Sequence, residues 1–468
     1  MKKELILLTF ILCSIRISAQ THGWVIVGDT GSNALNANGY ISCLRSDQNG
    51  NIYACGNFTN ASGKYYVAKW DGQSWTELGS GSNALNANNN IVALAADKSG
   101  NVYAAGIYTD ASDNSYIARW DGNSWHYMTG IQAMQGPTTI KDIAVDAADK
   151  FYACADTMID MITWFSRGFL EKWDGVNWEL APYTGSHPNL TCAYLWGPLK
   201  LAPDAFGNMY AISDTDYSWN PCNFNSSNVI KWNGTEWTQL GTGCNVLGAY
   251  GQLADLCTDP AGNVYAAGTI KNSLNHLYIA KWNGSAWGEL GNDPLFFTSS
   301  DFTSLCSDAS GNIYASGPWD ELNHLYVAKF NGTTWEKLSF RDFQNGSIGT
   351  ICTDPGGTLY AAGDFSNYYN GKDVYNVAKY VGLTGIKEER NIPVVDVCPN
   401  PADEDVTIRV EKYLPGSVYL LIDSFGRTVR TGVLSGLVSV IDLKSLATGL
   451  YFFSLVNQPG STVKLVKR

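Results

Sequence analysis

The sequence is dominated by a repeat of about 50 residues, which occurs seven times between Trp24 and Gly382. Each copy contains a Tyr-Ala pair followed by an apolar segment that ends in an aromatic residue. The tyrosine recurs at Tyr53, Tyr103, Tyr152, Tyr210, Tyr265, Tyr314 and Tyr360. The later aromatic residue recurs at Trp70, Trp120, Trp173, Trp232, Trp282, Phe330 and Tyr380. A period of this length is typical of proteins built from stacked or radially arranged units.

One copy of the repeat has the pattern of four short β-strands. In the first copy they cover residues 41–47, 50–56, 65–70 and 75–79, where β-branched and aromatic residues alternate with period two and no helical period appears. The first two segments are joined by a tight turn that contains Gly50, a residue that accepts positive φ. Asp71-Gly72, between the last two, favours a hairpin. Each copy is therefore predicted to form one antiparallel sheet.

An aspartate opens the first turn of every copy. The seven residues are Asp47, Asp97, Asp146, Asp204, Asp259, Asp308 and Asp354. Their regular spacing predicts a turn cap, in which the carboxylate accepts backbone N–H groups, rather than a single catalytic site. Weak calcium binding is the alternative interpretation.

The fourth segment carries a tryptophan in only six copies, at Trp75, Trp125, Trp178, Trp237, Trp287 and Trp335. The missing one is found at the front of the chain, where Trp24-Val-Ile-Val precedes a stretch nearly identical to the one after the first full repeat. The segment around Trp24 is therefore predicted to pair with the seventh repeat and to close a ring. An open solenoid is the alternative architecture.

The repeated motifs GN[IV]YA and AKW[DN]GxxW resemble the propeller repeats of secreted bacterial proteins. This resemblance implies an all-β fold, a seven-bladed β-propeller closed by the N-terminal strand, over residues 20–383. It is specific for the fold and not for an activity.

The first 19 residues have the features of a secretory signal peptide. Two lysines follow Met1, residues 5–15 are mostly apolar, and Ile17-Ser-Ala19 is a suitable cleavage site. Lipidation at Cys13 is less favoured, because Leu12 stands where a small residue usually precedes a lipidated cysteine. The mature chain is predicted to leave the cytoplasm and to carry no transmembrane helix.

The composition changes after the last repeat. Residues 384–391 form a charged linker, and residues 392–468 resemble the C-terminal (type A) sorting domain of the type IX secretion system. The motif residues are Pro399, Asn400, Pro401, Asp423, Gly426, Gly449, Tyr451 and Lys464. The resemblance implies recognition by the secretion machinery, followed by release or attachment at the outer-membrane surface. Alternating apolar residues such as those of Val418–Ile422 predict a small β-sandwich, for which an accessory ligand-binding domain is the alternative interpretation.

Charge and cysteine usage narrow the possibilities further. A net charge of −12 argues against nucleic acid and anionic membrane surfaces as partners. Five cysteines occupy repeat positions where other copies mostly have alanine, which predicts small buried core residues: Cys55, Cys154, Cys257, Cys306 and Cys352. Cys192, Cys222 and Cys244 lie outside the repeat pattern, and a disulfide between two of them is a hypothesis for which the sequence does not choose the pair.

Four insertions interrupt the repeats, at residues 156–167, 181–197, 213–228 and 364–373. In an up-and-down sheet these connections emerge on the face opposite the constant turns, and variable loops on a rigid scaffold commonly carry binding sites. The predicted ligand-binding residues are Trp164, Tyr194, Trp196, Tyr217 and Trp219. Their aromatic rings are suited to stacking on sugars or anchoring a protein partner. The alternative is that they fill space between the loops and the sheets.

Signatures of catalysis are sparse. We find no catalytic triad, no metal-binding spacing among the five histidines and no cofactor motif, and thus predict no catalytic or metal residues. Asp214 with Asp216, or Asp156 with Asp160, is a candidate carboxylate pair, although solvated loops explain them as well. The favoured interpretation is a secreted or cell-surface binding or adhesion module with a glycan or surface-protein ligand. An extracellular polysaccharide-active enzyme is the alternative, and a structural surface component is a third hypothesis.

Overall fold

The computed structural model describes residues 23–28, 33–128, 138–160, 165–175, 177–180, 200–215, 226–241, 247, 252–291, 301–319, 325–339, 346–369, 372–382, 395–398, 400–410, 417–423, 427–456 and 463–468. These residues form 37 β-strands and one short 3₁₀ turn (Gly81–Asn83), with no α-helix among them. None of the described segments is therefore a helix capable of spanning a membrane. The chain divides into two compact units, residues 1–382 and 383–468. The predicted signal peptide lies outside the described residues.

The described residues of the first unit form seven four-stranded antiparallel sheets and one two-stranded sheet. The first contains β2 (Ile41–Ser46), β3 (Ile52–Gly56), β4 (Ala68–Trp70) and β5 (Trp75–Glu77), and the second β6 (Ile91–Ala96), β7 (Val102–Gly106), β8 (Ile117–Trp120) and β9 (Trp125–Met128). The third contains β10 (Thr138–Val145), β11 (Phe151–Asp160), β12 (Phe165–Trp173) and β13 (Trp178–Leu180), and the fourth β14 (Leu201–Pro203), β15 (Met209–Thr215), β16 (Ser226–Trp232) and β17 (Trp237–Gln239). The fifth contains β18 (Leu253–Thr258), β19 (Val264–Gly268), β20 (Ala280–Trp282) and β21 (Trp287–Glu289), and the sixth β22 (Ser304–Ser307), β23 (Ile313–Trp319), β24 (Leu325–Phe330) and β25 (Trp335–Ser339). The seventh contains β26 (Ile348–Thr353), β27 (Leu359–Gly363), β30 (Ala378–Val381) and β1 (Gly23–Ile26).

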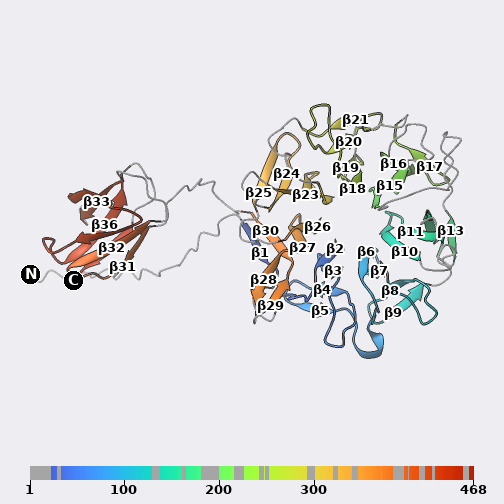
Figure 1. Ribbon diagram of the computed structural model, residues 1–468, viewed down its shortest axis with the longest axis horizontal. Helices are drawn as coiled ribbons and strands as arrows, with labels where there is room; N and C mark the ends of the chain where they lie inside the picture. The colour runs from blue at the N-terminus through green and yellow to red at the C-terminus, as the bar shows by residue number, and fades with distance from the viewer. Residues whose placement is uncertain are drawn as a thin grey trace, which may run out of the picture. The chain divides into compact units, whose positions relative to one another are not determined.

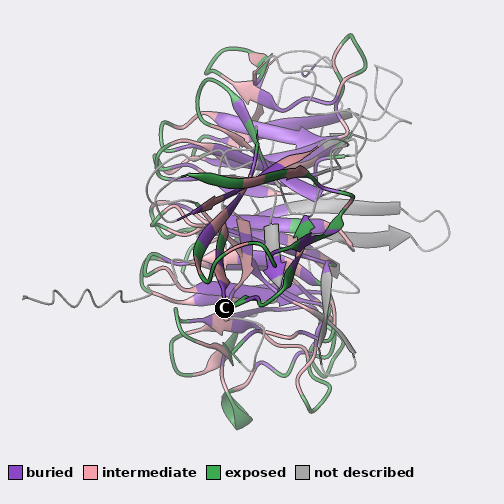
Figure 2. Cartoon of the chain, turned by 90° about the vertical axis from the view of Figure 1, so that its left-hand side faces the viewer, coloured by how far each residue is buried: buried purple, intermediate pink, exposed green. Residues whose placement is uncertain are grey.

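The sheets stand in a circle with their first strands innermost (Figure 1). Each first strand contacts the first strand of the next sheet, and β26 contacts β2, so the circle of sheets is complete. Apolar clusters lie between neighbouring sheets: Leu94 of the second sheet, for example, shares a cluster with Tyr53 and Val67 of the first. Buried residues are concentrated in the strands, and exposed residues in the turns that join them (Figure 2). The packing follows from the repeat, because a sheet with two apolar faces is stable only when both are covered.

The seventh sheet combines strands from the two ends of the first unit. β1 pairs antiparallel with β30, so that Trp24 lies opposite Tyr380, and the two ring centroids are 5.5 Å apart. The Trp24 indole is 4% exposed, and its Nε1–H donates to the Leu338 carbonyl oxygen at 3.4 Å. Four of the other six fourth-strand tryptophans make the same contact with the preceding sheet, as Trp125 does with the Leu78 carbonyl at 2.8 Å. Trp24 therefore makes the contacts of a fourth-strand tryptophan.

The turn aspartates act as the predicted caps. Asp47 Oδ1 accepts the backbone N–H groups of Asn49 and Asn51, each at 2.9 Å, while Oδ2 accepts the Asn51 side-chain amide at 2.7 Å and the Tyr53 hydroxyl at 3.1 Å. The repeat tyrosine donates to the turn aspartate in all seven sheets. Burial, followed by the nearby Asp97 carboxylate, raises the pKa of Tyr103 to about 12, so the phenol stays a donor. The tyrosine of each Tyr-Ala pair is therefore a hydrogen-bonding partner of the turn aspartate.

The cap predicts a graded loss of stability. Asp97→Ala removes the acceptor for the Asn101 N–H, the Asn101 amide and the Tyr103 hydroxyl, and we expect the free energy of unfolding to fall by about 2 kcal/mol. Tyr103→Phe removes one of these bonds, and about 1 kcal/mol is expected. Urea denaturation of both variants measures the difference. Equal losses would contradict the assignment of several bonds to Asp97.

Two of the predicted insertions contain regular structure where loops were expected, so that part of the prediction is wrong. β11 and β12 continue into residues 156–167, with Thr157 opposite Arg167, because the residues on both sides of the connection pair with each other. The insertion at residues 364–373 overlaps a separate two-stranded sheet of β28 (Ser366–Tyr369) and β29 (Lys372–Tyr375). Hairpin extension satisfies backbone groups that a free loop would leave to solvent.

The second unit contains two sheets. β31 (Val395–Cys398), β32 (Asp405–Val410) and β35 (Val438–Asp442) form one, and β34 (Thr428–Val433), β33 (Val418–Asp423), β36 (Gly449–Leu455) and β37 (Val463–Lys467) form the other. One apolar cluster includes residues of both sheets, among them Val406, Leu421, Phe453 and Leu465, all at most 1% exposed. The alternation of buried and exposed residues along β35 and β33 follows the period of two in the sequence.

Candidate functional site

The aromatic residues predicted to bind a ligand, Trp164, Tyr194, Trp196, Tyr217 and Trp219, all lie outside the described residues. The described strand ends nevertheless show where two of their segments are attached. Trp164 stands between β11 and β12, and Tyr217 and Trp219 between β15 and β16. These are connections between second and third strands in the third and fourth sheets.

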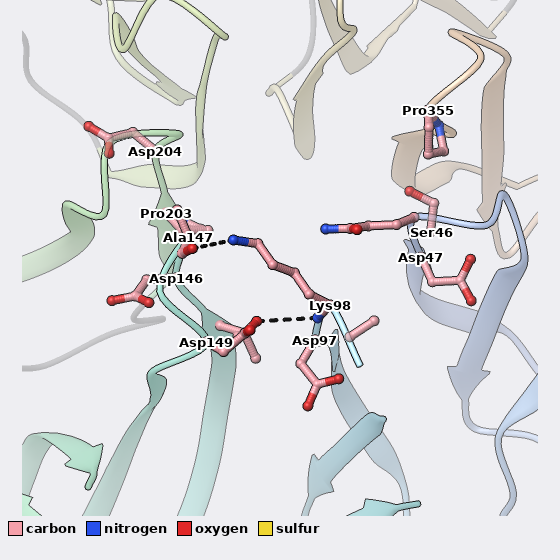
Figure 3. Close-up of a pocket in the computed structure, with 13 residues that line it drawn as sticks. Ser46, Asp47, Asp97, Lys98, Asp146, Ala147, Asp149, Pro203, Asp204 and Pro355 are labelled. Atoms are coloured by element: carbon pink, nitrogen blue, oxygen red, sulfur yellow. Dashed lines mark hydrogen bonds between the residues drawn. The ribbon is translucent and has the colours of Figure 1, made fainter. Parts of the chain in front are cut away.

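The structure instead describes a cavity of about 320 Å³ on the opposite face of the ring of sheets, where the first turns of the sheets lie. It is lined by the first turns of five sheets, with Asp47, Asp97, Asp146, Asp204 and Pro355 at its margin, and Lys98 extends across it (Figure 3). The Lys98 ammonium donates to the Ala147 carbonyl oxygen, and the Lys98 N–H donates to Asp149 Oδ1 at 3.2 Å. We call this cavity the channel mouth.

A second cavity of about 260 Å³ continues inward from the channel mouth. The two share Ser46, Ala96, Val145 and Pro203, and the inner one is also lined by Arg45 and Asp255. We call the two together the channel.

A chain of hydroxyl groups explains why the channel opens beside these sheets. Residues just before the turn aspartate donate from one sheet to the carbonyl of the preceding one: Ser46 to Thr353, Thr353 to Ser307, Ser307 to Thr258, and Thr258 to Pro203, at 2.6–2.7 Å. At the corresponding positions the second, third and fourth sheets carry Ala96, Val145 and Pro203, which have no hydroxyl donor. These three residues belong to the set that the two cavities share.

Four charged residues in or beside the innermost strands interact at the inner cavity, which Arg45 and Asp255 line. An Arg45 guanidinium nitrogen lies 3.8 Å from Asp142 Oδ1, and the Asp142 side chain is 2% exposed. The Asp142 carboxylate raises the pKa of Lys200, against the opposing effect of burial. Burial raises the pKa of Asp255, while Lys200 and the Leu305 N–H act in the opposite direction. One cation, Arg45, and one carboxyl group, Asp255, thus line the inner cavity, and Asp142 and Lys200 interact with them.

Both carboxylates connect neighbouring sheets through the backbone. Asp142 accepts the N–H of Ile143 and that of Leu201 in the next sheet, each at 3.0 Å. Asp255 accepts the corresponding pair, Leu256 at 3.0 Å and Leu305 at 2.8 Å.

Ser304 and Thr350 occupy the equivalent position and accept from the next sheet alone. Asp142 and Asp255 each accept a second N–H, that of the next residue in their own strand. The preceding sheet cannot accept this N–H, because its side chain at the equivalent position, Ala93 or Lys200, has no acceptor atom. Through these contacts the carboxylates of Asp142 and Asp255 hold neighbouring sheets together, and we call them interblade supports.

No motif or repeat pattern in the sequence pointed to Asp142, Lys200, Asp255 or Arg45. The sequence does contain a signal for them, because Asp142, Lys200 and Asp255 each stand four residues before a turn aspartate. That position differs among the seven copies and carries no periodic pattern of its own.

The predicted buried cysteines Cys55, Cys154, Cys257 and Cys352 are buried, and Cys306 is partly buried, which confirms the interpretation from alanine interchange. Cys192, Cys222 and Cys244 lie outside the described residues. Within the described ranges, no group of three or more His, Cys, Asp or Glu side chains is arranged to hold a metal ion. The histidine–carboxylate contact of His126 with Asp121, at 2.7 Å, is exposed.

Several sorting-motif residues are brought together in the second unit. The Asn400 side chain donates to the Lys464 carbonyl at 2.6 Å and accepts the Val466 N–H at 2.9 Å. Asp423 pairs with Arg427 at 2.8 Å.

The Tyr451 hydroxyl donates to the Ala447 carbonyl at 2.8 Å, Gly449 opens β36, and Pro401 is exposed. Pro399 and Gly426 are outside the described residues.

The seven sheets and the C-terminal unit define a β-propeller protein with a sorting domain for the type IX secretion system, and this domain directs the protein out of the cell. Residues 396–468 match the family described as secretion system C-terminal sorting domain. No curated protein matches the chain.

Three solved structures are similar in fold. YCF48 bound to D1 peptide has 14% identity and a TM-score of 0.49, over 79% of this chain and 98% of that one. PorZ, a surface component of the type IX secretion system of Porphyromonas gingivalis, has 15% identity and a TM-score of 0.46, over 92% and 59%. Puromycin hydrolase has 10% identity and a TM-score of 0.52, over 84% and 62%. At such identities the likeness concerns the fold alone.

Proposed function

We propose that this exported propeller is a binding or adhesion module that holds a glycan or a surface protein without transforming it. The observation that carries the proposal is that the carboxylates lining the channel are hydrogen-bonded to the backbone. Every aspartate that lines the described cavities accepts at least one backbone N–H, as Asp47, Asp149 and Asp255 do. Hydrolysis of a glycan needs two carboxyl groups that are available to substrate. Carboxylates committed to holding the fold leave the described channel without such a pair, which favours binding over catalysis there.

The proposed ligand surface is the face that carries the insertions, at the end of the propeller opposite the channel mouth. Its candidate contacts are Trp164, Tyr194, Trp196, Tyr217 and Trp219. A rigid ring of sheets supports loops at defined spacings, and exposed aromatic rings provide large contact areas at little cost in conformational entropy. Planar rings suit the apolar faces of sugars as well as protein side chains.

We also propose the following organisation of the chain. Residues 1–19 are a signal peptide, residues 20–383 a propeller closed by the N-terminal strand, residues 384–391 a linker, and residues 392–468 a β-sandwich that the secretion machinery recognises. After export the protein is attached to the cell surface or released. The pairing of β1 with β30 supports closure by the N-terminal strand, and the apolar cluster common to the two C-terminal sheets supports the β-sandwich.

A retention assay tests the proposed function. Residues 20–468 are passed over immobilised polysaccharides and surface glycoproteins, while newly formed reducing ends are measured in the eluate. We expect retention without release of reducing ends. Alanine substitution of Trp164, Trp196 and Trp219 together should weaken retention at least about tenfold, since truncation of central aromatic contacts commonly costs 2 kcal/mol or more.

Phe206→Ala is the matched control, because Phe206 is a 68% exposed aromatic residue in a first turn, at the opposite end of the propeller. Its loss should leave retention unchanged. Release of reducing ends would instead support the polysaccharide-active enzyme, and self-association without any retained ligand would support the structural surface component.

A further inference from the structure

Cys43 and Cys55 face each other across the first sheet. They are directly opposite in the antiparallel register of β2 and β3, at a point where the register shifts between Ile41 and Cys43. Opposite residues in such a pair have Cα atoms about 4.5–5.5 Å apart, which lies within the range that a disulfide spans. Cys43 is 5% exposed and Cys55 is fully buried. The backbone therefore brings the two thiols together without rearrangement.

The other sheets show that core packing does not require this pair. The same two positions carry Ala93 and Ala105 in the second sheet, and Thr350 and Ala362 in the seventh. The third sheet has a single cysteine, Cys154, opposite Asp142. Two cysteines occur at this position in the first sheet alone among the pairs whose register is described. Replacement of one core cysteine is explained by size, whereas a facing pair also permits covalent chemistry.

The surroundings make one thiol of the pair reactive. A hydrogen bond from Cys55 lowers the pKa of Cys43 to about 6, with help from Arg45 and Lys200 and against burial and Asp142. Burial raises the pKa of Cys55, and the neighbouring Cys43 acts in the same direction. The thiolate is the nucleophile in thiol–disulfide exchange, so Cys43 is the attacking residue and Cys55 the resolving one.

We propose that Cys43 and Cys55 form a disulfide that joins β2 to β3 in the exported protein. The oxidant is a disulfide of the cell envelope, R–S–S–R, carried by a protein or a small thiol. The Cys43 thiolate attacks one sulfur and releases RS⁻, which leaves a mixed disulfide. Cys55 then loses its proton and attacks the Cys43 sulfur, releasing the second RS⁻. Two protein thiols are oxidised, the oxidant is reduced to two thiols, and the proton of each cysteine passes to a released thiolate.

Export places the chain where such a bond persists. Disulfides are stable in the envelope and outside the cell, in contrast to the cytosol. Because Cys55 is fully buried in the folded protein, oxidation occurs after β2 has paired with β3 and before the first sheet packs against the second. At that stage the hydrogen bond from Cys55 and the nearby Arg45 already act on Cys43. Once formed, the bond is shielded by the same packing from reductants in solution.

The position of Arg45 permits a direct test by peptide mapping. Protein is collected from the medium or the cell surface, free thiols are blocked with N-ethylmaleimide during denaturation, and trypsin is added. Cleavage after Arg45 places Cys43 and Cys55 on separate peptides, the second being residues 46–64. We expect these two peptides to be joined, with neither cysteine blocked, and to separate on reduction. Blocked Cys43 and Cys55, or a link from either one to another cysteine, would overturn the proposal.

A stability measurement provides a second readout. The double variant Cys43→Ala/Cys55→Ala copies the second sheet, where two alanines occupy these positions, so it is expected to fold. Addition of reductant during urea denaturation should lower the midpoint of the parent protein more than that of the double variant. Cys154→Ala, which removes a buried thiol that lies opposite Asp142, should respond to reductant as the parent does. An identical response of parent and double variant would contradict the bond.

Discussion

Replacement of Trp24 by alanine is expected to lower the free energy of unfolding by about 3–5 kcal/mol. The indole is 4% exposed, packs edge-on against Tyr380 at 5.5 Å and donates to the Leu338 carbonyl of the sixth sheet. Its removal leaves a cavity between the sixth and seventh sheets and weakens β1, the outer strand of the seventh sheet. Urea denaturation followed by tryptophan fluorescence and circular dichroism measures the loss.

Tyr127→Ala is the control for Trp24→Ala. Tyr127 lies in β9, the outer strand of the second sheet, and is 61% exposed, so its truncation should change stability by less than about 1 kcal/mol. Deletion of residues 22–28 extends the test, because it leaves β30 as an unpaired edge prone to association. A deletion variant that remains monomeric with an unchanged melting temperature would contradict closure by the N-terminal strand.

The repeat made most of the propeller predictable. Asp47 and Tyr53 recur at a fixed spacing because the carboxylate, the turn N–H groups and the phenol form one hydrogen-bonded unit. Trp70 and Trp75 recur because they lie opposite each other at the hairpin, with ring centroids 5.8 Å apart. When local geometry demands the same residue in every copy, periodicity in the sequence is sufficient to identify it.

The channel was not predictable in the same way. Asp142 and Asp255 depend on which side chains the neighbouring sheets provide, a relation between residues about 50 positions apart that alters from sheet to sheet. Cys43 and Cys55 lie opposite each other because of the register shift in β2, and no pattern in the sequence predicted that shift. The aromatic loop residues are a third case: they fall outside the repeat that fixes the strands, so their roles remain predictions.

Asp142→Ala is expected to lower the free energy of unfolding by about 2–5 kcal/mol. The substitution removes the acceptor for two buried N–H groups, those of Ile143 and Leu201, each of which costs roughly 1–3 kcal/mol when unsatisfied. It also removes the carboxylate beside Arg45, although that contributes less because the Arg45 side chain is 36% exposed. The comparison with Asp301→Ala, an exposed aspartate of the same unit, isolates the effect of position.

The variant Asp142→Ser separates the contributions of the two hydrogen bonds that Asp142 accepts. Ser304 occupies the equivalent position in the sixth sheet and accepts the Ile351 N–H of the next sheet at 3.3 Å. A serine at 142 should therefore retain the bond to Leu201, lose the one to Ile143, and recover about half of the stability that alanine loses. If serine and alanine are equally destabilising, the loss arises from the Arg45 pair instead. The carboxylate would then be an electrostatic partner, free to interact with a ligand in the channel, and the interpretation of the channel as interblade support would fail.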